Sequence, residues 1–238
     1  MDPIVLGNYI TAPTVGAIAT TTYRGLEKFG LADFLARWRG LQHEALTMLG
    51  EDQRIHPSAS IHPTAIIGED VIIGPNVKVH EFTTVRKGSV LCAGAQVGFN
   101  CEVTAAFVGE DAVLGHRIGV NRTIIGARAH LSASVTVAAI NMTTDMRRPD
   151  REVIIRTGLG LYRCGTTQFG AVIGDDTQTG NSISIGPGVA IGRRCQITSG
   201  VALAIRGIPQ DCTVSAPHAT EATVRRRRRT LPPSQTTK

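Results

Sequence analysis

The stretch that decides the fold reads IHPSAS-IHPTAI-IGEDVI-IGPNVK-VHEFTT-VRKGSV-LCAGAQ-VGFNCE over residues 55–102, in units of six residues. The count continues to residue 142, and every unit head from Ile55 to Val137 is Ile, Val or Leu. A helix would space apolar residues by three and four, and an amphipathic strand by two. A period of six predicts an all-β solenoid in which each unit is one short strand and a turn, with its head side chain pointing inward.

Three units close one triangular coil, and successive coils stack as parallel strands about 4.8 Å apart. The units at 103–107 and 120–124 are one residue short, and we expect a corner to absorb each deletion. A polar stretch at about 142–152 predicts a loop that protrudes from the coil. The repeat resumes less regularly from residue 155, so we place the solenoid at residues 55–205.

The flanking segments differ from the repeat. Residues 1–54 form an N-terminal segment with one predicted helix, because Leu31, Phe34, Trp38 and Leu41 follow helical spacing and Gly50 supplies a stop. We expect this helix to cap the open end of the solenoid, where unpaired strand edges invite aggregation. The alternatives are packing along the first coil or against another subunit. Residues 206–238 are predicted to be an extension that ends in an arginine-rich tail.

Charge and composition exclude several classes of protein. Five of the charges behind the formal net charge of +6 are the consecutive arginines Arg225 to Arg229, and 6 − 5 leaves +1 for the rest. A near-neutral body argues against nucleic acid as a partner, apart from a weak contribution of that tail to binding phosphates. The sequence has no apolar run of membrane-spanning length and no recognisable secretory signal. Five cysteines without a CxxC pair predict free thiols in a cytoplasmic protein.

Chemistry is expected where the coil surface is interrupted, and the unit LGHRIG places His116 just after a corner glycine. A resemblance to a known family is visible in three places around it. These are FNCEVTAAFVGEDAVLGHRIGVNRTIIG at 99–126, the Asn141 region, and FGAVIGDDTQTGNSISIGPGVAIG at 169–192. These segments resemble the C-terminal acetyltransferase domain of bifunctional sugar-1-phosphate nucleotidylyltransferase/acetyltransferases, the archaeal type above all. That domain is a hexapeptide-repeat acyltransferase.

The resemblance implies a left-handed parallel β-helix that forms a homotrimer, with active sites between subunits and acetyl-CoA or another acyl-CoA as donor. His116 falls at the family's general base, a role that suits imidazole because it titrates near neutrality. Asn141 falls close to the family's asparagine beside the thioester, where an amide N–H steadies an oxyanion. Ser182, Ser184 and Ala190 would let the pantetheine arm lie along the outer wall.

The chain also departs from the family where the sugar phosphate is bound. The family's lysine is Thr104 here, its tyrosine is Gly119, and its later basic residues are Thr166, Thr167 and Gln168. We therefore expect a changed acceptor, an amine or less readily a hydroxyl, on an amino sugar or specialised metabolite. The predicted substrate-binding residues are Arg117, Asn121, Arg122, Arg147, Arg148 and Arg163.

Two other classes stay open at this point. The γ-class carbonic anhydrases share the fold and bind a metal with three histidines, and His80 precedes His116 by 36 residues, or two coils. Asn121 stands where their third histidine is expected, so we predict no metal, because zinc requires three or four good donors. The other alternative is a non-catalytic trimeric scaffold.

Overall fold

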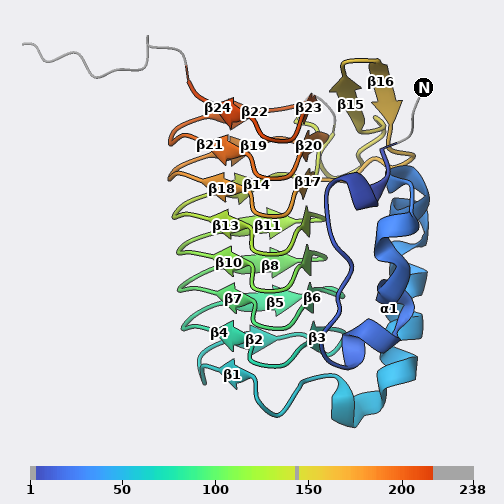
Figure 1. Cartoon of the computed structure of the whole chain (residues 1–238), viewed down its shortest axis with the longest axis vertical. Helices are drawn as coiled ribbons and strands as arrows, with labels where there is room; N and C mark the ends of the chain where they lie inside the picture. The colour runs from blue at the N-terminus through green and yellow to red at the C-terminus, as the bar shows by residue number, and fades with distance from the viewer. Residues whose placement is uncertain (1–3, 143–144, 217–238) are drawn as a thin grey trace, which may run out of the picture.

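The computed structural model describes residues 4–142 and 145–216 and shows a parallel β-helix built from three sheets (Figure 1). The first sheet contains β1 (Ser60–Ile61), β4 (Lys78–Val79), β7 (Gln96–Val97), β10 (Val113–Leu114), β13 (His130–Leu131), β18 (Gln178–Thr179), β21 (Gln196–Ile197) and β24 (Thr213–Val214). The second contains β2 (Ile66–Ile67), β5 (Thr84–Arg86), β8 (Glu102–Thr104), β11 (Gly119–Asn121), β14 (Thr136–Val137), β19 (Ser184–Ile185) and β22 (Ala202–Leu203). The third contains β3 (Ile72–Ile73), β6 (Val90–Leu91), β9 (Phe107–Val108), β12 (Ile124–Ile125), β17 (Ala171–Ile173), β20 (Val189–Ile191) and β23 (Arg206–Ile208).

The strand register confirms the six-residue reading and the parallel β-helix. Lys78 pairs with Gln96, 18 residues on, whereas Gln96 pairs with Val113, only 17 residues on. The two short units are absorbed at the corner between the second and third sheets, where Ala105 and Arg122 have positive φ angles of 48° and 46°. The unit heads form one continuous apolar core inside the coils.

Two predicted boundaries are wrong. Residues 155–166, read as two hexapeptides, form an antiparallel hairpin of β15 (Ile154–Thr157) and β16 (Gly160–Arg163) instead. The pairing of Thr157 with Gly160 leaves two residues for a tight turn, and the coil resumes only at β17. At the other end, β23 and β24 still pair with their sheets, so the β-helix continues past residue 205 to Val214.

The N-terminal segment covers the third sheet. It contains η1 (Leu6–Asn8), η2 (Ala17–Thr20), η3 (Thr22–Lys28) and α1 (Leu31–Gln53), and α1 runs alongside the stack (Figure 1). Gly50 ends the regular helical part of α1 with a φ of 67°, as predicted. The expectation that this helix caps the end of the solenoid is wrong. The reason is that the outward side chains of the third sheet are apolar and need a cover: Ile72, Val90, Phe107, Ile124, Val172 and Ala190.

A second apolar cluster therefore joins α1 and the preceding segment to the β-helix. Phe107 is fully buried and stacks on Tyr23 with a centroid distance of 5.6 Å. Phe34 and Trp38 of α1 belong to the same cluster, with ring centroids 4.9 Å apart. This arrangement leaves the first and second sheets as the uncovered faces of the described chain (Figure 1).

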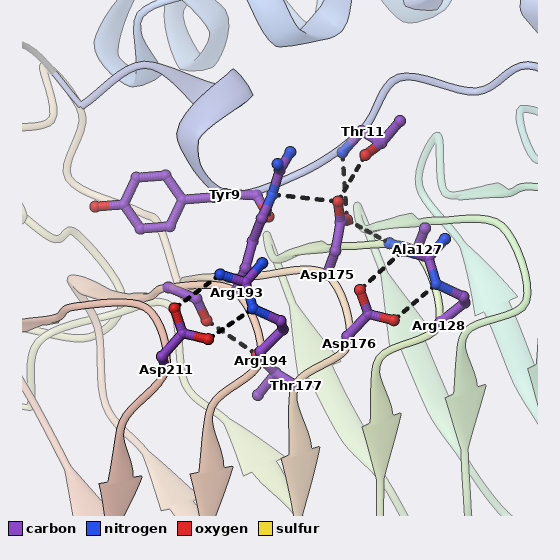
Figure 2. Close-up of polar contacts among 11 residues, drawn as sticks. Tyr9, Thr11, Ala127, Arg128, Asp175, Asp176, Thr177, Arg193, Arg194 and Asp211 are labelled. Atoms are coloured by element: carbon purple, nitrogen blue, oxygen red, sulfur yellow. Dashed lines mark hydrogen bonds and ion pairs between the residues drawn. The ribbon is translucent and has the colours of Figure 1, made fainter.

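Residues 4–30, which we call the strap, are also held by two carboxylates of the coil, Asp175 and Glu110, and Figure 2 shows the contacts of Asp175. Asp175, which is 3% exposed, accepts hydrogen bonds from Thr11 N (3.2 Å), Thr11 Oγ1 (2.7 Å) and Ala127 N (2.8 Å). Glu110 accepts from the backbone N–H groups of Thr14 (2.6 Å) and Val15 (2.7 Å). Backbone donors that would otherwise be unpaired are thus satisfied by the β-helix itself.

The five cysteines are free thiols, as predicted. None of the helices in the described ranges combines the length and the hydropathy that a bilayer crossing requires.

We expect Phe107→Ala to lower the free energy of unfolding by about 3–5 kcal/mol, because it removes a buried ring and leaves a cavity between the third sheet and the N-terminal segment. Chemical denaturation followed by circular dichroism measures this. Met48→Ala, at a residue of α1 that is 59% exposed, is the control and should change stability little. Equal stability of the two variants would contradict the packing described here.

We expect Asp175→Ala to loosen the strap, because three donors lose their acceptor in a buried place. Limited proteolysis should cleave within residues 4–30 faster than in the unmodified protein. The neighbouring Asp176 is half-exposed and forms a bidentate pair with Arg128 (2.7 and 2.8 Å), so Asp176→Ala is the matched control. Equal cleavage rates in the two variants would show that Asp175 does not anchor the strap.

Candidate functional site

His116 lies on the corner between the first and second sheets, in the turn that joins β10 to β11. Its side chain is exposed, and its carbonyl accepts a hydrogen bond from Ser134 N of the next coil at 2.9 Å. The next residue, Arg117, is also exposed and has a φ of 54°, which makes the sharp corner. Gly115 before it lies in a confined place, because a Cβ there would be only 3.1 Å from the carbonyl oxygen of Leu131.

Two of the predicted cofactor-binding residues lie on the same part of the surface. Ser182 is exposed on this corner and donates its backbone N–H to Ala133 O at 2.9 Å, two coils after His116. Ser184 is exposed on the second sheet, in the ladder that connects Gly119, Thr136 and Ser184. The short side chains of both serines leave room along the outside of the coils for an extended ligand.

Other predicted residues lie elsewhere in the single chain. His116 precedes the second-sheet strand of its coil, whereas Asn121 and Arg122 lie at the other, C-terminal end of that strand. Asn141 follows β14 and lies on the same side of the second sheet as Asn121. Arg147 and Arg148 are exposed on the protruding loop. Arg163 lies on the hairpin and forms an ion pair with Glu152. One chain therefore does not bring Asn141 and these arginines to His116.

Ala190 has a different environment from the other predicted cofactor-binding residues. It is fully buried on the third sheet, inside the cluster that the N-terminal segment covers. A methyl group with no exposed surface cannot contact a cofactor, so Ala190 leaves the set of candidates.

A cavity of about 470 Å³ on the second sheet reaches this corner, and sequence reasoning had missed most of its lining. Arg117 and Gly119 contribute to it, together with Phe82, Arg86, Glu102 and Cys101. Arg86 pairs with Glu102 and donates from Nε to Thr104 Oγ1 at 3.2 Å. Burial raises the pKa of the Cys101 thiol, which keeps it protonated and makes it a poor nucleophile.

An exposed aromatic pair marks the same corner. Phe82 is 61% exposed and Phe99 is 41% exposed, and their rings meet edge to face with centroids 5.9 Å apart. Both occupy turn positions of their units, where polar residues are usual. Their spacing of 17 residues is one less than the full coil of 18, which makes them diagonal neighbours on successive coils, and this is the signal that could have placed them together from the sequence.

The register argues against a histidine metal site. In the first sheet, Val97 pairs with Val79 of the coil before and with Leu114 of the coil after. His80 is therefore in register with Gly98 and Gly115, whereas His116 is in register with Glu81 and Phe99. The residue missing from the unit at 103–107 puts His80 and His116 out of register. Within residues 4–142 and 145–216, no group of three or more His, Cys, Asp or Glu side chains is arranged to hold a metal ion.

Comparisons with known proteins agree with this fold. A family model described as the GMPPB C-terminal domain matches residues 49–145, less than half of the chain. An uncharacterized acetyltransferase, YaiX of Escherichia coli O6:K15:H31, is 26% identical over 112 residues, 47% of this chain and 46% of that protein. The bifunctional protein GlmU of Methanococcus maripaludis is 30% identical over 107 residues, 45% of this chain and 24% of that protein.

These matches relate the chain to hexapeptide-repeat acetyltransferases, which confirms the resemblance seen in the sequence. The chain spans about half the length of YaiX and about a quarter of GlmU. Among solved structures, perosamine N-acetyltransferase from Caulobacter crescentus, determined with CoA and GDP-perosamine, has a TM-score of 0.33 and 16% identity. That alignment covers 79% of this chain and 64% of the other.

Proposed function

We propose that this protein is an acyltransferase that moves an acetyl or other acyl group from acyl-CoA to an amine of a small molecule, with His116 as the general base. The observation that supports this most is an exposed histidine at a β-helix corner beside a cavity, in a chain related to named acetyltransferases. The alternative acceptor, a hydroxyl group, would use the same base. The reaction would take place in the cytoplasm, where acyl-CoA is available.

In the proposed reaction, the His116 imidazole takes a proton from the acceptor amine as the nitrogen attacks the thioester carbonyl. A tetrahedral intermediate forms with negative charge on the former carbonyl oxygen. The intermediate collapses to the amide as the C–S bond breaks, and the CoA thiolate receives the proton from the imidazolium. Imidazole suits both transfers because it gains and loses a proton near neutral pH.

Asn141 would stabilise the oxyanion from a neighbouring subunit. In one chain, His116 and Asn141 lie at opposite sides of the second sheet, so a site that uses both would take them from two subunits, as in the proposed homotrimer with intersubunit sites. The third sheet is already covered by α1, whereas the corner with His116 and the exposed Phe82–Phe99 pair is available for a partner subunit. The acyl-CoA arm would follow the corner past Ser182 and Ser184.

The cavity on the second sheet is the proposed acceptor site. Arg117 and Arg86 would attract an anionic group of the acceptor, and Glu102 would attract its ammonium before deprotonation. The aromatic faces of Phe82 and Phe99 would pack against a ring. Asn121, Arg122, Arg147, Arg148 and Arg163 would bind substrate or CoA phosphates across the subunit boundary.

We expect His116→Ala to lower kcat by about 10²- to 10⁴-fold with little change in the affinity for acyl-CoA, because only the proton transfer is lost. Release of CoA thiol in the presence of candidate amines measures turnover. His130→Ala, at an exposed histidine of β13 on the following coil, is the matched control. Full turnover of the His116→Ala variant would exclude the proposed mechanism and favour a non-catalytic scaffold.

We expect Glu102→Gln to raise KM for an amine acceptor by about tenfold and to leave KM for acyl-CoA unchanged, since one charge-assisted contact is worth about one to two kcal/mol. Steady-state kinetics with one substrate varied at a time separates the two constants. Glu69→Gln, at another exposed glutamate, is the control. A change in the constant for acyl-CoA alone would move the acceptor out of this cavity.

A further inference from the structure

The hairpin of β15 and β16 lies at the end of the β-helix that carries β23 and β24, and its turn projects beyond the last coil (Figure 1). One face of the hairpin packs on the rest of the chain. Ile155 is fully buried, and Ala32 N donates to the hydroxyl oxygen of Tyr162, its partner across the hairpin, at 2.9 Å. Arg156 and Leu161 pair on the opposite face, which therefore points away from this packing, since side chains alternate along a strand.

Exposed aliphatic side chains lie at the tip of the hairpin. Leu159, in the two-residue turn, is 69% exposed, and Leu161 is 49% exposed. The hairpin segment at 154–163 reads IIRTGLGLYR and contains no acidic residue. Leucines on a projecting turn leave water only when another apolar phase or surface receives them. The tip is thus an apolar protrusion without a negative charge of its own.

Arginines border this tip. Arg156 is exposed, and its backbone N–H donates to Ile205 O at 3.4 Å, so it lies beside the segment that contains Arg206. Arg206 is in register with Val189, which is fully buried one coil earlier. Because β23 is the last strand of its sheet within the described residues, Arg206 itself is exposed. In the part of the chain that the structure describes, neither arginine forms an ion pair.

The positive charge of the chain is concentrated in the segment that builds this end. Residues 177–238 contain nine Lys or Arg and two Asp or Glu, a net charge of +7, so 6 − 7 leaves −1 for residues 1–176. Five of these arginines, Arg225 to Arg229, lie outside the described residues, and the sequence connects them to β24 in the last coil. Such a charge asymmetry attracts an anionic partner to this end of the chain.

We propose that this end binds the surface of a lipid bilayer that contains anionic lipids. Leu159 and Leu161 would enter the acyl-chain boundary, and Arg156 and Arg206 would lie among the headgroups. We call these four residues the docking surface. The proposed acyl transfer uses none of them.

A bilayer fits the docking surface better than a macromolecular partner does. A specific protein interface buries about 800 Å² on each side, and it would need a pocket for the projecting tip. A nucleic acid offers phosphates to the arginines, but its charged backbone gives the leucines no apolar interior. A bilayer supplies both an anionic surface and an apolar interior below it.

The test is flotation of the full chain with vesicles of phosphatidylcholine alone and with vesicles that also contain phosphatidylglycerol. The protein should bind the anionic vesicles at least about tenfold more tightly, and added salt should weaken this binding, because salt screens the attraction between arginines and headgroups. Binding to neither vesicle, or equal binding to both, would overturn the proposal. Binding of RNA without binding of anionic vesicles would assign the arginines to nucleic acid instead.

Leucine variants separate insertion from surface attraction. Leu159→Ser combined with Leu161→Ser should lower the partition coefficient for anionic vesicles by at least about tenfold, because two apolar side chains no longer leave water. Met48→Ser, at an exposed methionine of α1, is the matched control and should bind like the unmodified protein. Circular dichroism checks that each variant is folded. Unchanged partition of the leucine variant would show that the tip does not enter the bilayer.

Arginine variants test the headgroup contacts. Arg156→Gln combined with Arg206→Gln should weaken binding to anionic vesicles by at least about tenfold, whereas Arg39→Gln, at an exposed residue of α1, should not. Equal binding of these two variants would remove the arginines from the docking surface and overturn the assignment. His116→Ala should bind the vesicles normally, so failure of this docking and failure of the proposed catalysis are separable.

Discussion

The whole structure depends on one constraint, the narrow apolar space inside each triangular coil. For most units it accepts the aliphatic head and the small or apolar side chain two positions before it, such as Val77 and Val79. The next coil must repeat this arrangement above it, because parallel strands pair residue by residue. Every corner must then turn sharply, and many of these turns place a non-glycine residue at positive φ. Functional side chains can vary only outside this core, and His116 is one of them.

Covering one of the three faces decides where chemistry can occur. The outward side chains of the third sheet are apolar and pack under α1 and the strap, so that face has no surface for a ligand. Ala190 lies under this cover, although its position in the repeat looks like that of an exposed small residue. The first and second sheets and their common corner remain accessible. His116, the Phe82–Phe99 pair and the cavity on the second sheet lie close together at this corner.

Electrostatics has a structural role at the corner between the third and first sheets. Charges of opposite sign stack there in neighbouring coils, with Arg128 on Asp176 and Arg194 on Asp211 (Figure 2). Hydrogen bonds from the arginines lower the pKa of both aspartates below the usual 3.8. Their contribution to stability is therefore present at neutral pH and is lost only as the pH falls below that value. The same corner supplies the carboxylates that hold the strap.

The sequence by itself determined the β-helix, the inward heads, the corner position of His116 and the helical spacing of residues 31–49, because a strict period dictates which side chains face inward. It could not determine what α1 covers, since that depends on outward positions of strands far apart in the chain, which meet only after the coils stack. Nor could it reveal the hairpin, where an apolar stretch can pair either with the coil or with itself. The offset of His80 from His116 was present in the repeat, where His80 is second in its unit and His116 third, and the register shows the same offset. The cavity with Arg86 and Glu102 followed only from the folded chain, because its lining comes from several stacked coils.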